Sequence, residues 1–257
     1  MKTKTISFKN SKGINLSGKL ELPENQQPVA YAIFAHCFTC NKNLSAVKNI
    51  ARALKSNGFG VVRFDFTGLG QSEGDFAETN FSSNIQDLED IAQYMTQELE
   101  APKLMIGHSL GGAAAIFAGK SIASIQAVAT VGAPSSPQHV QHLFKSGIEE
   151  IQANGKALVN IGGRPFPISK QFIEDISTKN MNEIVKSLRK PLLLFHSPQD
   201  TTVGVNNATE IYTAAIHPKS FVSLDGADHL LTNKEDSIYV GNMIAHWAVR
   251  YLSLIHI

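Results

Sequence analysis

A serine stands between two glycines in the motif Gly107-His108-Ser109-Leu110-Gly111, which follows a short apolar run and precedes an alanine-rich stretch. A serine hydroxyl attacks a carbonyl only when a base takes its proton and N–H donors stabilise the oxyanion that forms. Glycines on both sides of the serine let a strand and a helix approach closely around a nucleophile held on a strained turn. The motif therefore predicts that Ser109 projects from the edge of a sheet, with the N–H of Leu110 beside it.

A base and an acid for this serine are expected just after other strands, because ligands of an open parallel sheet bind at the carboxyl ends of its strands. Asp200 follows an apolar run that ends at His196, and His229 follows a run that ends at Leu224. Serine, acid, histidine is one of the chain orders in which a catalytic triad occurs. We predict that His229 takes the Ser109 proton and returns it to the leaving group, while Asp200 fixes the tautomer of His229.

Other histidines and acids at the ends of elements compete for these roles. The histidines are His36, His108, His196 and His217, and the nearest acidic rivals of Asp200 are Asp225 and Asp228. Taken singly, each histidine is better explained by a structural role, whereas strand, loop position and chain order agree for His229. His108 adjoins the serine and is expected to point to a different side of the turn. An acid next to His229 in sequence is poorly placed to bond its ring.

The oxyanion that forms on the substrate needs two N–H donors. Leu110 supplies one, and the second is expected from the loop after the apolar run of residues 29–35. We predict the N–H of Phe38 as that second donor, with Cys37 as the reserve.

Apolar runs and helical periodicities alternate along the chain. After a hairpin over residues 3–22, strands are expected at 29–35, 60–64, before Ser109, and at 127–131, 191–196 and 220–224, with helices near 47–54, 85–99, 206–216 and 240–247. The alternation predicts an α/β fold with a mostly parallel, twisted sheet and helices on both faces. Between about residues 135 and 190 it fails, leaving helical pieces near 139–144, 170–176 and 182–188 and a hairpin within 157–167. We predict a single domain over 1–257 with this segment as a small cap insertion.

The composition narrows the classes of partner. The 257 residues are 43% apolar, and 23 Lys and Arg against 22 Asp and Glu leave a formal charge of +1. No basic run is interleaved with aromatic residues, so we expect neither a nucleic-acid nor a membrane partner. The chain begins without an apolar signal segment, and no apolar run approaches the roughly 18 residues that a membrane span needs. We expect a cytoplasmic protein without a cofactor or a metal.

Two further motifs could carry chemistry of another kind. Cys37 and Cys40 form a C-x-x-C pair that lies too close in sequence to staple a fold, which agrees with a reducing compartment. Inert packing of the two thiols is favoured over redox cycling and over metal binding together with His36. Residues 68–74 are glycine-rich, but no helix follows directly, so a structural turn is favoured over a phosphate loop.

Five motifs together resemble the α/β-hydrolase superfamily. They are His36-Cys37-Phe38-Thr39, residues 64–74, Gly107-His108-Ser109-Leu110-Gly111-Gly112, the Asp200 loop and Gly226-Ala227-Asp228-His229. More narrowly, the chain is similar to the hydrolase domain of bacterial proteins fused to a C-terminal OsmC-type redox domain, with further matches at Cys40, residues 80–84 and residues 163–166. Cys37 stands where many relatives have glycine. Because the sequence given ends at Ile257, we expect either a stand-alone hydrolase or a truncated fusion.

The resemblance implies a serine hydrolase of carboxylic esters. We expect a small-molecule ester as substrate and an acyl-Ser109 intermediate, with thioester or amide hydrolysis as the alternative of the same mechanism. Thiol chemistry at Cys37 and Cys40, or a hydrolase fold kept as a binding module for a redox partner, are the alternatives of another class. The candidate assemblies are a homodimer or a complex with a redox domain. The apolar tail of residues 252–257 is expected to pack on the core, join a partner or mark a truncation.

Overall fold

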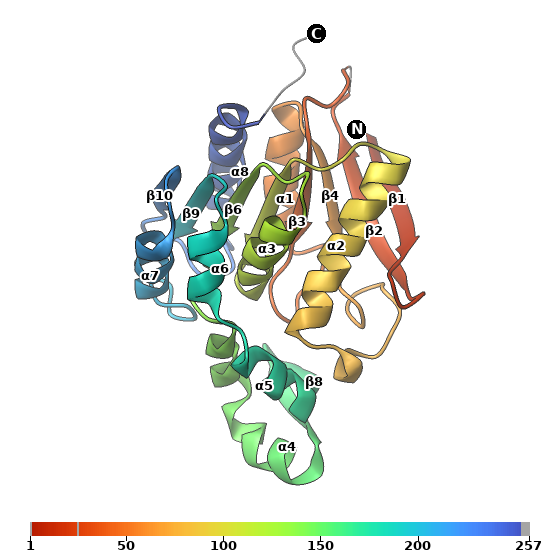
Figure 1. Ribbon diagram of the computed structural model, residues 1–257, viewed down its shortest axis with the longest axis vertical. Helices are drawn as coiled ribbons and strands as arrows, with labels where there is room; N and C mark the ends of the chain where they lie inside the picture. The colour runs from red at the N-terminus through yellow and green to blue at the C-terminus, as the bar shows by residue number, and fades with distance from the viewer. Residues whose placement is uncertain (1, 25, 253–257) are drawn as a thin grey trace.

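Eight strands form the central sheet in a computed structural model that describes residues 2–24 and 26–252. They are β1 (Lys2–Lys9), β2 (Asn15–Leu22), β3 (Tyr31–Ala35), β4 (Gly60–Phe64), β5 (Leu104–His108), β6 (Ala127–Val131), β9 (Leu192–His196) and β10 (Lys219–Ser223). Their order across the sheet is β1-β2-β4-β3-β5-β6-β9-β10 (Figure 1). β2 pairs antiparallel with β1 and β4, and the other neighbours are parallel. The predicted mostly parallel sheet is confirmed.

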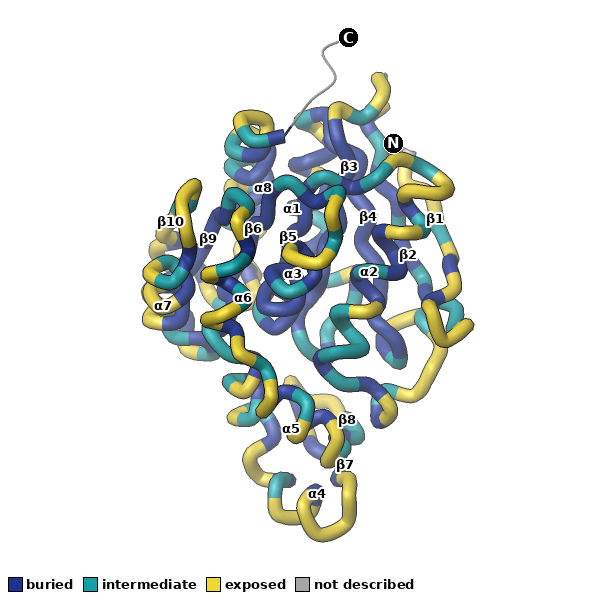
Figure 2. The backbone as a smooth tube through the Cα atoms, viewed as in Figure 1, coloured by how far each residue is buried: buried dark blue, intermediate teal, exposed yellow. Residues whose placement is uncertain are grey.

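The central strands are apolar because both faces of the sheet are covered. β3, β4, β5, β6 and β9 are buried along their whole length (Figure 2). Leu194 packs into the layer on one face and Phe195 into the layer on the other, as the alternation of side chains along a strand requires. Helices α1 (Ser45–Ser56) and α8 (Lys234–Val249) cover one face, and α2 (Phe81–Glu98), α3 (Leu110–Ser121) and α7 (Asn206–Ala214) cover the other (Figure 1).

The direction in which successive strands are added to the sheet reverses at β3, and this reversal determines where a crevice forms. From β3 the chain moves to β4 on one side and then crosses to β5 on the other. The loops that follow β3 and β5 therefore lead to helices on opposite faces of the sheet, α1 and α3. In open α/β sheets, ligands bind at such a switch point, beyond the carboxyl ends of the strands. Ser109 and the loop of residues 36–44 both lie there.

Residues 135–190, called the insertion here, lie between β6 and β9. Residues 137–177 project beyond the sheet at the bottom of Figure 1, whereas residues 181–187 lie beside α3. The elements of the insertion are the 3-10 helix η2 (Pro137–Gly147), α4 (Ile148–Asn154), the hairpin β7 (Lys156–Ile161) and β8 (Arg164–Ser169), α5 (Lys170–Ser177) and α6 (Met181–Ser187). Phe144, Ile151 and Phe172 are buried within it. The predicted hairpin and the two later helices are confirmed, whereas α4 was not expected, because its apolar positions are few.

Three further observations complete the architecture. The 3-10 helix η1 (Phe76–Glu78) follows the glycine-rich loop of residues 68–74, which turns around the carboxylate of Asp65. Of the apolar tail, Leu252 packs beside α8, and residues 253–257 lie outside the described residues. Among the described helices, none combines the length and the apolar character needed to cross a membrane.

Candidate active site

Ser109 occupies a tight turn between β5 and α3. Its backbone has φ 56° and ψ −129°, a conformation that a residue with a side chain rarely adopts, and its N–H donates to the Val131 oxygen at 2.8 Å. A Cβ at Gly107 would lie 2.2 Å from the Gly111 oxygen, and a Cβ at Gly111 would lie 2.2 Å from the His36 oxygen. Only glycine fits at these two positions, because strand and helix approach each other as closely as the motif predicts.

Three side chains from distant parts of the chain meet above this turn. Ser109 Oγ–H donates to His229 Nε2 at 2.9 Å, and His229 Nδ1–H donates to Asp200 Oδ2 at 2.7 Å. The bond to Asp200 leaves the lone pair of Nε2 directed at the serine. In this arrangement His229 can accept the serine proton and Asp200 can stabilise the resulting imidazolium.

Asp200 is held in its charged form. Its Oδ1 accepts the N–H groups of Thr202 and Val203, both at 2.8 Å, and its side chain is almost fully buried. Burial alone would raise the pKa of this carboxyl, but the hydrogen bonds from His229 and from the two backbone N–H groups outweigh it, so the pKa lies below its ordinary value. A permanently charged acid is what orientation of the imidazole requires.

The rival acids and histidines are engaged elsewhere. Asp225 accepts the hydroxyl of Ser223, Asp228 accepts the backbone N–H of Thr232, and neither bonds the His229 ring. His36 Nδ1–H donates to the Cys37 oxygen at 2.9 Å, and His196 Nε2–H donates to the Val203 oxygen at 2.7 Å. Burial lowers the pKa of both rings. In the described part of the chain, His229 alone lies within hydrogen-bonding distance of Ser109 Oγ.

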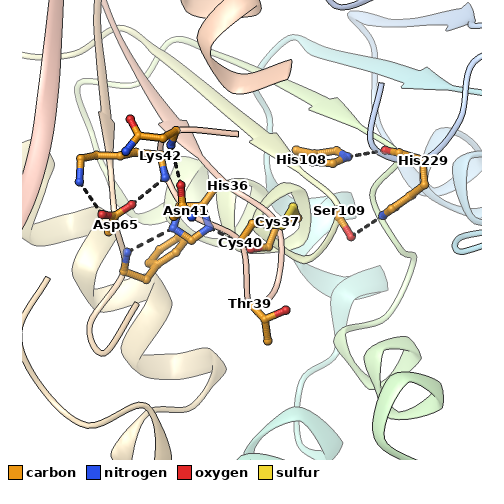
Figure 3. Close-up of a disulfide and its surroundings, with 12 residues drawn as sticks. His36, Cys37, Thr39, Cys40, Asn41, Lys42, Asp65, His108, Ser109 and His229 are labelled. Carbon is orange, nitrogen blue, oxygen red and sulfur yellow. Dashed lines mark hydrogen bonds and ion pairs between the residues drawn. A yellow bond between two sulfur atoms is a disulfide. The ribbon is translucent and has the colours of Figure 1, made fainter. Parts of the chain in front are cut away.

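His108 has a contact that the sequence did not suggest. Its Nε2–H donates to the backbone oxygen of His229 at 2.7 Å, and the two rings lie 5.1 Å apart (Figure 3). Burial, followed by the neighbouring His229, lowers the pKa of His108 to about 3. The ring, expected on a different side of the turn from Ser109, bonds the loop of His229 rather than the serine hydroxyl. No local pattern could reveal a contact between residues 121 positions apart.

The cysteines form a disulfide, which corrects the expectation of two packed thiols. Cys37 and Cys40 are bonded, with their Cα atoms 5.3 Å apart, because a turn with Thr39 at φ 59° reverses the chain between them. A pair three residues apart can close such a turn even though it cannot staple distant elements. The reducing compartment expected from the close spacing of the two cysteines stays a prediction. No group of three or more His, Cys, Asp or Glu within the described ranges is arranged to hold a metal ion.

The two N–H groups predicted to bind the oxyanion, those of Leu110 and Phe38, both belong to residues that lie near Ser109. Leu110 begins α3 directly after Ser109, and Phe38 lies in the disulfide turn beside it. Among the described residues, neither backbone N–H has an acceptor within hydrogen-bonding distance. Cys37 lines the cleft as well, and the choice between Phe38 and Cys37 stays a prediction.

A cleft of about 660 Å³ opens in front of Ser109 and His229. It is lined by residues 37–41 and 43–45 of the loop after β3 and, from the insertion, by Leu143, Ile161 and Arg164. Arg164 Nη2–H donates to the Thr39 oxygen at 2.9 Å, so the insertion and the disulfide turn are in direct contact. The volume matches that of sites for small organic ligands.

The mostly parallel eight-stranded sheet, the serine turn at its switch point and the facing histidine and acid define an α/β hydrolase. The sequence matches the profile of the family described as serine aminopeptidase, S33, over residues 26–161, which is more than half of the chain. The chain belongs to this family.

Relatives support this assignment. The crystal structure of the esterase domain from a Rhodothermus marinus protein is 49% identical, covers 98% of this chain and 99% of that chain, and has a TM-score of 0.82. Est1E from Butyrivibrio proteoclasticus, solved with ferulic acid bound, is 19% identical and covers 96% of this chain and 98% of its own. Its TM-score of 0.77 shows a shared fold. The mouse mitochondrial palmitoyl-protein thioesterase ABHD10 is 25% identical over 76% of this chain and 67% of its own length.

Proposed function

We propose that the protein hydrolyses small carboxylic esters through an acyl-Ser109 intermediate. The observation that carries the proposal is the hydrogen-bonded row of Ser109, His229 and Asp200 at the mouth of the cleft. The 49% identity to a domain described as an esterase, over nearly the whole of both chains, supports the ester as the substrate.

Each side chain of the row has one task. Ser109 Oγ attacks the ester carbonyl while its proton passes to His229 Nε2, and Asp200 stabilises the imidazolium. His229 then gives the proton to the oxygen of the leaving alcohol. In the second half, His229 deprotonates a water molecule that attacks the acyl carbon, which releases the acid and restores the Ser109 hydroxyl.

The charge on the tetrahedral intermediate falls on the carbonyl oxygen. The N–H groups of Leu110 and Phe38, which have no acceptor among the described residues, are the donors for this oxygen. Leu110 also begins a helix, whose N-terminal dipole favours an anion.

The cleft indicates the kind of ester. Phe38, Leu143 and Ile161 line it beside Ser109 and suit an apolar acyl or alkoxy group. Because Leu143 and Ile161 belong to the insertion, residues 135–190 act as a cap that helps to select the substrate. Hydrolysis of thioesters or amides is the second candidate, since one relative is named a thioesterase and the family is described as a serine aminopeptidase.

The test replaces the nucleophile. Ser109→Ala is expected to lower kcat for p-nitrophenyl butyrate by on the order of 10⁴-fold or more, with thermal unfolding close to that of the wild type. Ser121→Ala, at the far end of the same helix, is the matched control and should keep full activity. A fluorophosphonate should add one adduct to the wild type and none to Ser109→Ala. Turnover by Ser109→Ala equal to that of the wild type would refute the proposal.

A substrate panel separates the two candidates. Esters, thioesters and anilides that share one butyryl group differ only in the leaving group, so the ratios of kcat/KM report the preferred bond. We expect the ester to have the highest kcat/KM. An anilide or thioester that is cleaved tenfold faster than the ester would assign the second candidate.

A further inference from the structure

The disulfide between Cys37 and Cys40 closes a ring around just two residues, Phe38 and Thr39. The backbone N–H of Phe38 is the donor that we assign to the substrate oxyanion. The bond therefore constrains the very peptide whose direction decides whether that donor points at the reacting oxygen. Figure 3 shows this turn beside Ser109.

Thr39 lies in a conformation that its own chemistry does not favour. Its φ is 59°, the left-handed region that a β-branched residue avoids. Such a conformation persists only when the surroundings enforce it. Here the described contacts are the disulfide, the Cys40 N–H and His36 Nδ1–H donated to the Cys37 oxygen at 3.1 and 2.9 Å, and the Arg164 guanidinium donated to the Thr39 oxygen. Without the disulfide, the turn can relax to a lower-energy backbone.

Both flanks of the turn are anchored, so a relaxation would stay local. Upstream, the oxygen of His36 lies against Gly111, with no room for a Cβ between them. Downstream, the fully buried Lys42 forms an ion pair with Asp65, which also accepts the Lys42 backbone N–H. The disulfide therefore controls residues 37–41 and leaves the rest of the fold in place.

The peptide that carries the Phe38 N–H is held through its carbonyl, because the Cys37 oxygen accepts from His36 Nδ1–H at 2.9 Å and, across the turn, from the Cys40 N–H at 3.1 Å. The ring of Phe38 is also held. It lies 5.2 Å from the ring of Phe172 and 5.8 Å from that of Phe76. Loss of the disulfide would therefore loosen the Cys40 N–H bond to the Cys37 oxygen and let the Phe38 N–H turn, while the ring contacts keep the side chain in place. Cys37 and Cys40 both line the cleft, and Cys40 is only half-buried, so a small thiol reaches the bond from the substrate side.

We infer that the Cys37–Cys40 disulfide is a positioning element for the Phe38 N–H, so that hydrolysis is fast when the bond is intact and slow when it is reduced. The inference rests on the proposed esterase function. A small dithiol supplies the electrons: one thiolate attacks Cys40 Sγ, the Sγ–Sγ bond breaks, and Cys37 leaves as a thiolate that takes up a proton. The second thiol of the reductant attacks the mixed disulfide, which releases the Cys40 thiol and leaves the reductant oxidised.

The experiment measures kcat and KM for p-nitrophenyl butyrate on oxidised, reduced and reoxidised protein. Reduction uses dithiothreitol, which is then removed under argon, and a thiol titration should rise from zero to two per chain. Removing one oxyanion donor costs about 10² to 10³ in kcat in serine hydrolases, and a displaced donor retains part of its effect. We therefore expect kcat to fall at least tenfold on reduction, KM to change less than twofold, and reoxidation to restore the rate.

A variant without the bond provides the matched control. Cys37→Ser/Cys40→Ser should have the low kcat of the reduced protein and should not respond to dithiothreitol. The pH dependence of kcat/KM should keep its shape in every form, because Ser109, His229 and Asp200 do not belong to the turn. A purely structural staple would instead lower kcat together with the helical circular dichroism and the unfolding temperature.

Failure of this inference is distinguishable from failure of the proposed function. A reduced protein with two titrated thiols and an unchanged, Ser109-dependent kcat would overturn the inference and leave the esterase function intact. A reduction that lowers kcat only by unfolding the protein would also overturn it. An oxidised protein without any Ser109-dependent turnover would contradict the proposed function itself.

Discussion

His108 donates its Nε2–H to the backbone oxygen of His229 at 2.7 Å, so the residue before Ser109 in sequence holds the loop of the histidine that faces Ser109. A proton on His108 would place a charge in a fully buried position beside a second imidazole. Burial and the neighbouring His229 therefore lower the pKa of His108 to about 3. The ring is neutral at the pH values at which a serine hydrolase works.

This depressed pKa predicts a pH dependence of stability. Unfolded His108 binds a proton below its ordinary pKa of 6.5, whereas the folded protein does not until about pH 3. The stability that His108 contributes is thus complete above pH 6.5 and falls as the pH decreases towards 3, by up to about 1.4 kcal/mol per pH unit. His108→Gln keeps a donor for His229 but does not ionise. Between pH 7 and pH 5, the free energy of unfolding in urea should fall about 2 kcal/mol less for this variant than for the wild type. Equal losses would contradict the prediction.

Replacement of Asp200 tests the orientation of the imidazole. In Asp200→Asn, the side-chain amide can donate to His229 Nδ1, which would place the proton on Nε2 and leave no base for Ser109. We expect kcat to fall about 10³- to 10⁴-fold with little change in KM. Asp225→Asn is the control, because within the described ranges Asp225 accepts the Ser223 hydroxyl and does not bond His229, and it should stay within about twofold of the wild type. Comparable losses in the two variants would argue against a specific role of Asp200.

The close approach at Gly111 predicts intolerance of a methyl group. In Gly111→Ala the Cβ would meet the oxygens of His36 and Ala35 at 2.2 and 2.6 Å, and strand ends and helix start cannot both move away. We expect a loss of about 3 kcal/mol in the free energy of unfolding, together with a lower kcat, since the turn carries Ser109. Gly204→Ala is the matched control, because its Cβ would meet only the Asn206 side chain, which can rotate. Equal stability of both alanine variants would refute this explanation.

The ion pair of Lys42 and Asp65 is fully buried, which predicts a large effect when one partner is removed. Lys42→Met leaves the Asp65 carboxylate without its cation and should lower the free energy of unfolding by about 3 to 5 kcal/mol. The double variant Lys42→Met/Asp65→Asn removes the uncompensated charge while an oxygen remains for the Gln71 N–H. Chemical denaturation should find the double variant more stable than Lys42→Met. A double variant that is no more stable than Lys42→Met would contradict the prediction.

Much of the fold could be predicted because its signals are local. Buried strands such as β5 and β9 are continuous apolar runs, and α1 repeats its apolar residues with a helical period. The serine turn could also be predicted, since the two glycines around Ser109 reflect backbone contacts a few residues apart. Chain order then singled out Asp200 and His229, whose side chains the structure brings together with Ser109.

The sequence by itself determined most of the strands and helices along the chain, the strained serine turn and the residues able to face it, because periodicity and glycine placement are local patterns and chain order needs no knowledge of the fold. Only the tertiary structure decided that His108 supports His229, that Arg164 of the insertion bonds Thr39, and that Cys37 and Cys40 close a ring beside Ser109. The first two contacts join residues that are more than a hundred positions apart, and the third depends on a left-handed Thr39 that no local preference favours. Such arrangements exist because the packed fold enforces them.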